Sequence, residues 1–168
     1  MNSETSLELE NQYCFPIYAA SRVVTKLYTP LLNKLGLTYP QYLTMLVLWQ
    51  YDILTVNEIG DKLMLESNTL TPLLKRLENQ ELITRKRSSI DERVVEISLT
   101  KKALELKQLA SIIPEKFACS IGTLGISQEE MEQLKRTLLK LITISEQKNR
   151  KCRISKLHSN IKIYGNFK

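Results

Sequence analysis

The spacing of apolar residues changes along the chain from a helical period to a period of two, and then returns. Up to about Gln80, apolar side chains recur every three or four residues, which indicates amphipathic helices. Residues 82–87 and 93–99 alternate instead, which indicates two short strands joined by 88–92. Helical spacing resumes after Thr100. This order predicts a mainly α protein with one small β-hairpin.

The helices before the hairpin have recognisable beginnings. The apolar spacing predicts a first helix over about 15–34. Thr38-Tyr-Pro-Gln41 and Thr55-Val-Asn-Glu58 have the form of capping boxes, so each opens a further helix. Ser67 is expected to cap a fourth helix, which ends near Gln80. After the hairpin, we expect a helix capped by Thr100 and interrupted at Pro114, and a last one opened by Ser127-Gln-Glu-Glu130.

The segment after Ser67 has two different faces when it is drawn as a helix. At about 100° per residue, Leu70, Leu74 and Leu77 fall on one side. The other side is polar and basic, with Asn68, Pro72, Lys75 and Arg76 flanked by Thr69 and Thr71. A helix that reads a DNA major groove needs small donors and acceptors at its N-terminal end and Lys or Arg for phosphates. This side, together with Ser67 at the start of the helix, is therefore a candidate DNA-reading surface.

The predicted hairpin is basic near its tip, where Arg85, Lys86, Arg87 and Arg93 gather. A guanidinium at such a tip can enter a minor groove, where the electrostatic potential of DNA is most negative. Helix, short turn, helix and basic hairpin together predict a winged helix-turn-helix over about residues 38–100.

The net charge of +6 does not by itself indicate a nucleic-acid partner. Residues 148–168 contain seven basic and no acidic side chains, so residues 1–147 carry 17 basic against 18 acidic ones. We expect this basic tail to be flexible, with a modest contribution to nonspecific binding. The local positive bias lies over residues 75–102, which hold eight basic and five acidic side chains.

Several classes of protein are excluded by composition and motifs. A length of 168 residues favours one domain, and no apolar run approaches the ~20 residues that span a bilayer. The polar, acidic start lacks the pattern of a signal peptide, so we expect a cytoplasmic protein. Cys14, Cys119 and Cys152 form no CxxC pair, and His158 is the single histidine, so neither a metal site nor a cofactor is expected. The chain carries no phosphate loop and no catalytic triad, which argues against an enzyme.

Two groups of motifs resemble a known family. The segment Leu63–Leu77, with Asp91-Glu-Arg93 and Ser98-Leu-Thr100, is similar to the MarR family of dimeric winged-helix transcription factors. Within that family, the OhrR group of organic-hydroperoxide sensors is resembled most, through Gln12-Tyr-Cys-Phe15, Tyr18-Ala-Ala-Ser-Arg22, Leu37-Thr-Tyr-Pro-Gln-Tyr42 and Thr69-Leu-Thr-Pro72. The resemblance covers about residues 9–147. It implies a homodimer on a pseudo-palindromic double-stranded DNA operator, with helices over about 11–35 and 101–147 forming the dimerisation region of a single domain, 1–147.

The resemblance also implies roles for particular residues. Cys14 would be the peroxide-sensing thiol, hydrogen-bonded by Tyr28 and Tyr39 of the partner subunit. Arg93 would be the arginine that enters the minor groove, and Asp91 the carboxylate that orients it. Cys119 would be the resolving thiol of the two-cysteine members, although a packed spectator is the alternative. Cys152 falls outside the family pattern, and we expect it to be a bystander.

Elementary chemistry agrees with sensing at Cys14, which is expected at the start of the first helix. A helix N-terminus and phenolic donors stabilise a thiolate, the reactive form of cysteine. Apolar neighbours such as Phe15 and Ile17 favour an organic peroxide over hydrogen peroxide. Oxidation to sulfenic acid removes the charge and weakens those hydrogen bonds.

The predicted function is therefore a repressor that releases its operator when organic hydroperoxide oxidises Cys14, which derepresses a peroxide-detoxifying thiol peroxidase gene. Three alternatives stay open at this point. The first is a one-cysteine global regulator of oxidative stress in the same family. The second is a repressor gated by phenolic ligands, with an inert Cys14. The third is a thiol peroxidase enzyme, in which a basic hairpin has no place.

Overall fold

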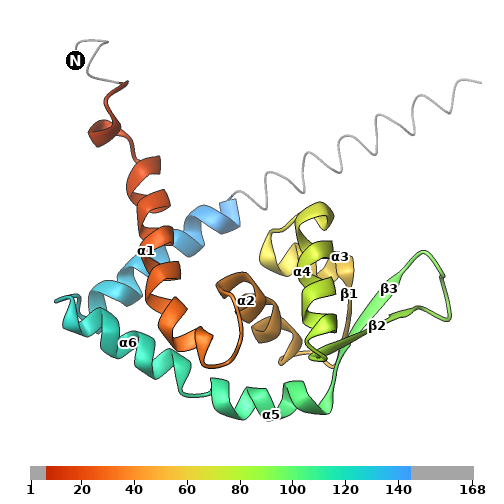
Figure 1. Cartoon of the computed structure of the whole chain (residues 1–168). Coiled ribbons are helices and arrows are strands. Elements are labelled where there is room, and N and C mark those ends of the chain that lie inside the picture. The colour runs from red at the N-terminus through yellow and green to blue at the C-terminus, as the bar shows by residue number, and fades with distance from the viewer. Residues whose placement is uncertain (1–6, 145–168) are drawn as a thin grey trace, which may run out of the picture. The chain divides into compact units, whose positions relative to one another are not determined.

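The computed structural model describes residues 7–144, so the basic tail from 148 onward lies outside the described residues. Within the described residues the chain divides into two compact units, one ending at Phe117 and the other beginning at Ala118, and the division falls inside helix α6. The elements in chain order are η2 (Leu9–Asn11), α1 (Cys14–Asn33), α2 (Tyr39–Leu48), β1 (Ile53–Thr55), α3 (Val56–Leu63), α4 (Ser67–Asn79), β2 (Ile83–Arg87), β3 (Val95–Leu99), α5 (Lys101–Ala110), α6 (Ile113–Thr123) and a last helix, Gln128–Ile144 (Figure 1). The prediction of a mainly α chain with a small β wing is confirmed.

The capping motifs begin helices where the sequence predicts them. The Thr38 backbone N–H donates to Gln41 Oε1 at 2.8 Å, and the Thr55 N–H donates to Glu58 Oε2 at 2.7 Å. Helix α4 differs by one residue, because its N-cap is Glu66 and not Ser67. The carbonyl of Glu66 accepts the first helical hydrogen bond, from the Leu70 N–H at 3.0 Å, so Ser67 is already the first helical residue.

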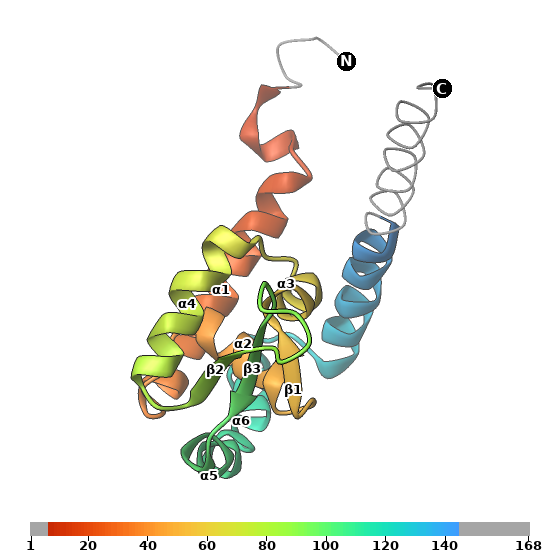
Figure 2. The ribbon, with the colours of Figure 1, turned by 90° about the vertical axis from the view of Figure 1, so that its right-hand side faces the viewer.

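The wing is a three-stranded antiparallel sheet in the order β1-β3-β2. Strands β2 and β3 form the predicted hairpin, with Arg87 opposite Val95, and residues 88–94 connect them. Strand β1 was not predicted, because three residues are too few to show a period of two; it pairs with β3 through Leu54 opposite Ile97. In Figure 1 the hairpin extends beyond helices α2–α4, and in Figure 2 its loop faces the viewer.

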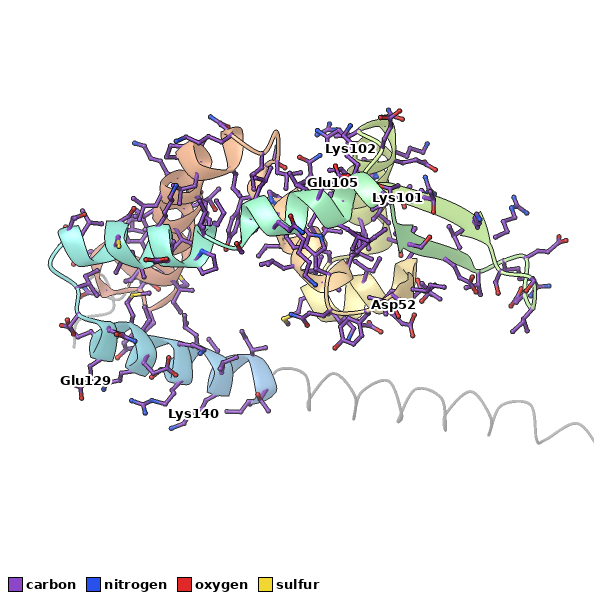
Figure 3. All side chains as sticks on the ribbon, turned by 90° about the horizontal axis from the view of Figure 1, so that it is seen from below. Asp52, Lys101, Lys102, Glu105, Glu129 and Lys140 are labelled. Carbon is purple, nitrogen blue, oxygen red and sulfur yellow. The ribbon has the colours of Figure 1, made fainter. Side chains whose placement is uncertain are left out.

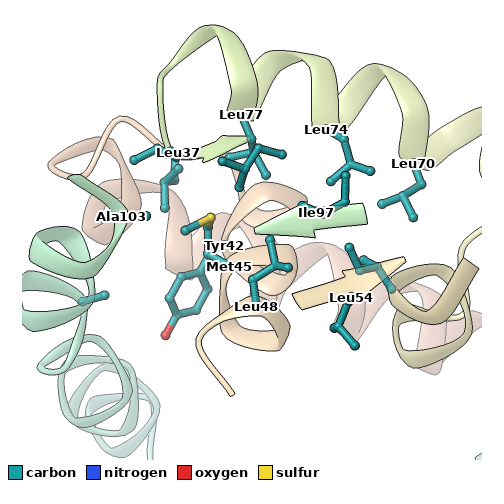
Figure 4. Packing of buried hydrophobic residues seen from close by; sticks show 14 of the residues in the cluster. Leu37, Tyr42, Met45, Leu48, Leu54, Leu70, Leu74, Leu77, Ile97 and Ala103 are labelled. Carbon is teal, nitrogen blue, oxygen red and sulfur yellow. The ribbon is translucent and has the colours of Figure 1, made fainter. Parts of the chain in front are cut away.

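Helix α4 is anchored to the sheet and to α2 through its apolar face. Leu70, Leu74 and Leu77 are each 0% exposed, as the helical spacing predicted. Figure 4 shows these three side chains directed toward Ile97 of β3 and the buried side chains of α2. Burial of one face therefore leaves the polar face of α4 on the outside of the molecule.

The helices after the wing keep several apolar side chains on the surface. Thr100 caps α5, where its Oγ1 accepts from the Ala103 N–H at 3.2 Å, and Pro114 is the second residue of α6, so the predicted interruption is confirmed. Ala103 and Ile113 are buried, but these apolar residues are exposed: Leu104, Leu109 and Ile112. The last helix begins at the Ser127–Glu130 box and exposes Leu134, Leu139, Leu141, Ile142 and Ile144.

Candidate nucleic-acid interface and thiol site

The predicted DNA-reading surface lies on the outward face of α4. Six of its residues are exposed and Thr71 is half-buried; the exposed six are Ser67, Asn68, Thr69, Pro72, Lys75 and Arg76. Thr71 donates to the Ser67 carbonyl at 2.7 Å, and Thr69 donates to Asn68 Oδ1 at 3.2 Å. The surface therefore presents short polar side chains in the first turns of α4 and two cations in the next turn.

The loop of the hairpin is held in shape by its own hydrogen bonds. Ser88 is buried and its N–H donates to the Val94 carbonyl at 2.9 Å, while the Val94 N–H donates to the Asp91 carbonyl at 2.9 Å. The Asp91 carboxylate accepts from the backbone N–H of Arg93 at 2.9 Å. None of the ion pairs found within residues 7–144 joins the side chains of Asp91 and Arg93. Asp91 thus fixes the backbone of Arg93, whose side chain stays exposed with those of Lys86 and Arg87.

Arg85 occupies a different position from the other basic residues of the hairpin. It is the central residue of β2, opposite Ile97, and not near the tip as the sequence suggested. Its guanidinium lies 3.6 Å from the Glu78 carboxylate, and 21% of its side chain is exposed. The Nε atom is buried without a partner. Arg85 therefore connects β2 to α4, and the exposed cations of the hairpin are the other three.

Cys14 is the first residue of α1, which is the position that the sequence predicts, and the structure shows that its side chain is exposed. Tyr28 lies fourteen residues further along the same helix, which corresponds to about 21 Å of helical rise. The two side chains of one chain therefore cannot meet. A hydrogen bond between this thiol and the Tyr28 phenol requires a second copy of the chain.

Three phenols, Tyr28, Tyr39 and Tyr42, pack together and are called the tyrosine cluster below. The ring of Tyr28 lies 5.0 Å from that of Tyr39 and 5.8 Å from that of Tyr42, and it stacks on Phe117 at 4.3 Å. Burial raises the pKa of Tyr28 to about 12, with smaller contributions from Tyr42 and Tyr39, and burial also raises the pKa of Tyr39 and of Tyr42. The phenols thus keep their protons at neutral pH and remain hydrogen-bond donors.

Tyr28 and Tyr39 are among the site residues predicted from the sequence, whereas Tyr42 and Phe117 are not. Tyr42 follows Tyr39 by one helical turn, a spacing that could have indicated a shared face. Phe117 is distant in sequence, and no local pattern connects it to Tyr28.

Cys119 is exposed in α6, in the second unit. Cys152 lies outside the described residues.

Two further kinds of feature are absent from residues 7–144. No group of three His, Cys, Asp or Glu side chains there could hold a metal ion. No single helix there is long and apolar enough to cross a membrane.

A helix with a polar and basic outward face, preceded by a second helix and followed by a basic hairpin, defines a winged-helix protein. A family model described as "Transcriptional regulator SarA/Rot" matches residues 26–109. The organic hydroperoxide resistance transcriptional regulator of Bacillus subtilis (strain 168) is 51% identical over 148 residues, which cover 88% of this chain and 99% of that protein.

Solved structures of AbfR, a Staphylococcus epidermidis protein, are also similar. Reduced AbfR bound to DNA has a TM-score of 0.66 and 34% identity, and disulfide-formed AbfR has a TM-score of 0.57 and 35% identity. Each comparison covers 83% of this chain and 95% of the AbfR chain. The chain belongs to the MarR family of winged-helix transcriptional regulators. Because its relatives are transcriptional regulators, it is a regulator and not an enzyme.

Proposed function

We propose that this regulator represses transcription as a homodimer and senses organic hydroperoxides through Cys14. The observation that carries the proposal is the position of Cys14, exposed at the N-terminus of α1 in a chain 51% identical to a regulator of organic hydroperoxide resistance. A cysteine that serves only packing is typically buried, since free cysteines behave as small hydrophobes.

In this proposal, α4 enters the major groove of a pseudo-palindromic operator and the hairpin loop enters the adjacent minor groove. The exposed Asn68 and Thr69 are suited to base edges, and Lys75 and Arg76 are suited to phosphates. Arg93 sits beyond the end of β2, on a loop held by hydrogen bonds, where its guanidinium can reach into the groove. Two copies of α4 would read half-sites about 10 base pairs apart, or a multiple of that.

The dimer would form through the helices at both ends of the chain, over about 11–35 and 101–147, within one domain spanning 1–147. Helix α1 exposes Phe15, Ile17, Tyr18 and Val23, and the last helix exposes the five apolar side chains named above. Exposed apolar side chains that gather along a helix in this way mark surfaces for contact with another protein. A second copy also supplies the phenols of Tyr28 and Tyr39 that Cys14 of the same chain cannot reach.

The sensing step would be a two-electron oxidation of the Cys14 sulfur by the hydroperoxide. The thiolate attacks the terminal peroxide oxygen, an S–O bond forms, the O–O bond breaks, and the alkoxide leaves and takes up a proton as alcohol. The product is a neutral sulfenic acid, which has lost the negative charge that the phenols stabilise. The sulfur of Cys119 of the partner subunit then attacks the Cys14 sulfur: an S–S bond forms, the S–O bond breaks, and the hydroxide that leaves takes up the proton of the Cys119 thiol and departs as water. That AbfR has a disulfide-formed structure supports this second step.

A DNA-binding titration tests the proposal. The wild-type protein is titrated onto the DNA upstream of its own coding region, untreated, after cumene hydroperoxide, and after hydroperoxide followed by dithiothreitol. We expect tight binding, loss of binding and recovery, in that order. Binding that is unaffected by the hydroperoxide would contradict peroxide sensing, and release by a phenolic compound alone would favour the ligand-gated alternative. In the proposed function, the derepressed gene encodes a thiol peroxidase.

A further inference from the structure

Three amide hydrogen bonds run from the first turn of α2 to the end of α4. The Thr38 backbone N–H donates to Gln41 Oε1 at 2.8 Å. Gln41 Nε2 then donates to Gln80 Oε1 at 3.3 Å, and Gln80 Nε2 donates to the Gly36 carbonyl at 3.1 Å. Gln41 is 5% exposed, so its amide has little access to water.

The direction of this amide chain is fixed by the backbone groups at its two ends. A backbone N–H can only donate, so Gln41 must turn its oxygen toward Thr38 and its NH₂ group toward Gln80. Gln80 must then accept with its oxygen, which leaves its NH₂ group for the carbonyl of Gly36. Neither amide can flip without losing a partner, and the loss is most unfavourable at Gln41, whose amide is buried. A flip of either amide therefore breaks the series of three hydrogen bonds.

The two glutamines connect the start of α2, which carries Tyr39 and Tyr42, to the end of the proposed DNA-reading helix. Thr38 immediately precedes Tyr39, whose ring lies 5.0 Å from that of Tyr28. Gln80 is the C-cap of α4, and its backbone carbonyl accepts from Lys102 Nζ at 2.8 Å. Lys102 stands in the first turn of α5 (Figure 3). The end of α4 is thus held from α2 by side-chain amides and from α5 by a lysine.

We propose that Gln41 and Gln80 are positioning residues that transmit the state of the tyrosine cluster to α4. This inference rests on the proposed function, because it assumes that oxidation of Cys14 disturbs the phenols around it. A shift of Tyr39 moves Thr38 and the amide that Thr38 holds, so the end of α4 either follows or loses its link to α2. Through this link, a change at the thiol alters the position of the helix that reads DNA.

The test uses two substitutions that keep the shape of the side chain and remove one donor. Gln41→Glu still accepts from Thr38 but offers no N–H to Gln80. If Gln80 flips to pair with the new carboxylate, it loses Gly36 instead, so the amide chain is broken in either case. Gln80→Glu still accepts from Gln41 but cannot donate to Gly36. Gln50→Glu, just beyond α2 and exposed, is the control for the added negative charge.

Three quantities are measured for each full-length variant: the operator Kd before cumene hydroperoxide, the operator Kd after it, and sulfenic acid formation at Cys14 by dimedone labelling. We expect normal labelling in all variants. We expect the ratio of oxidised to reduced Kd to fall about fivefold or more in Gln41→Glu and Gln80→Glu, and to stay at the wild-type value in Gln50→Glu. A purely structural role would weaken binding in both states without changing that ratio.

The outcomes separate this inference from the proposed function. If the wild-type protein releases the operator on oxidation and both glutamine variants keep its ratio of Kd values, only the role of the glutamines is overturned. If the wild-type protein keeps its operator after oxidation, the proposed function fails and the inference fails with it. Thermal unfolding checks that each variant is folded. If Gln41→Glu does not fold, the ratio of Kd values in Gln80→Glu alone tests the role of the two glutamines.

Discussion

Arg93 lies in the hairpin loop and combines an exposed guanidinium with a backbone that is held by a hydrogen bond. Its N–H donates to the Asp91 carboxylate, while the side chain itself is exposed. Arg93→Ala should therefore weaken operator binding by about 1–3 kcal/mol, the scale of one good groove contact, without changing stability. Fluorescence anisotropy with labelled operator measures the effect, and Glu92→Ala on the same loop is the control. If Arg93→Ala binds the operator with wild-type affinity, the proposal that the hairpin loop contacts DNA is wrong.

Tyr28 gives the free energy of unfolding a defined dependence on pH. The pKa of its phenol is raised to about 12 in the folded chain, so the unfolded chain loses this proton first as the pH rises above about 10. Stability should therefore fall with pH in that range, and Tyr28→Phe should make the fall less steep. Urea unfolding at about pH 9 and about pH 11 measures this, with Tyr13→Phe on an exposed ring as the control. Equal losses in the wild-type and Tyr28→Phe proteins would contradict the assignment.

At the scale of elements, α4 depends on three leucines for its position on the sheet. Leu74 is 0% exposed, so Leu74→Ala leaves a cavity and should cost about 2–5 kcal/mol of unfolding free energy. Ile53→Ala on the exposed face of β1 should cost much less, because that side chain is 59% exposed. Guanidinium chloride unfolding compares the two. Similar losses of unfolding free energy in the two variants would contradict the claim that the leucine face of α4 holds this helix on the sheet.

Most of these elements could be predicted from local patterns. The capping boxes at Thr38 and Thr55 and the leucine spacing of α4 depend on residues within one or two turns, so the sequence displays them directly. The remaining features depend on contacts between distant segments. Arg85 is directed to Glu78 by the register of β2 on β3, and the tyrosine cluster is completed by Phe117, which is remote in sequence. No spacing rule encodes either contact.

At the scale of the whole molecule, the proposal of two-cysteine sensing predicts a covalent dimer. Hydroperoxide should convert the wild-type protein into a species of twice the mass on nonreducing gels, and dithiothreitol should reverse it. Cys119→Ser should abolish the cross-link yet retain sulfenic acid at Cys14, and Cys152→Ser should change neither. A cross-link that survives in Cys119→Ser and disappears in Cys152→Ser would assign the resolving role to the other cysteine.

The central claim is that oxidation of Cys14 releases the operator, and operator binding by Cys14→Ser tests it most directly. Cys14 lies at the start of α1 and not on α4 or the hairpin, so the serine variant should bind the operator with nearly wild-type affinity. Addition of cumene hydroperoxide should then release the wild-type protein, while Cys14→Ser stays bound. If the hydroperoxide releases Cys14→Ser to the same extent as the wild-type protein, Cys14 is not the sensor.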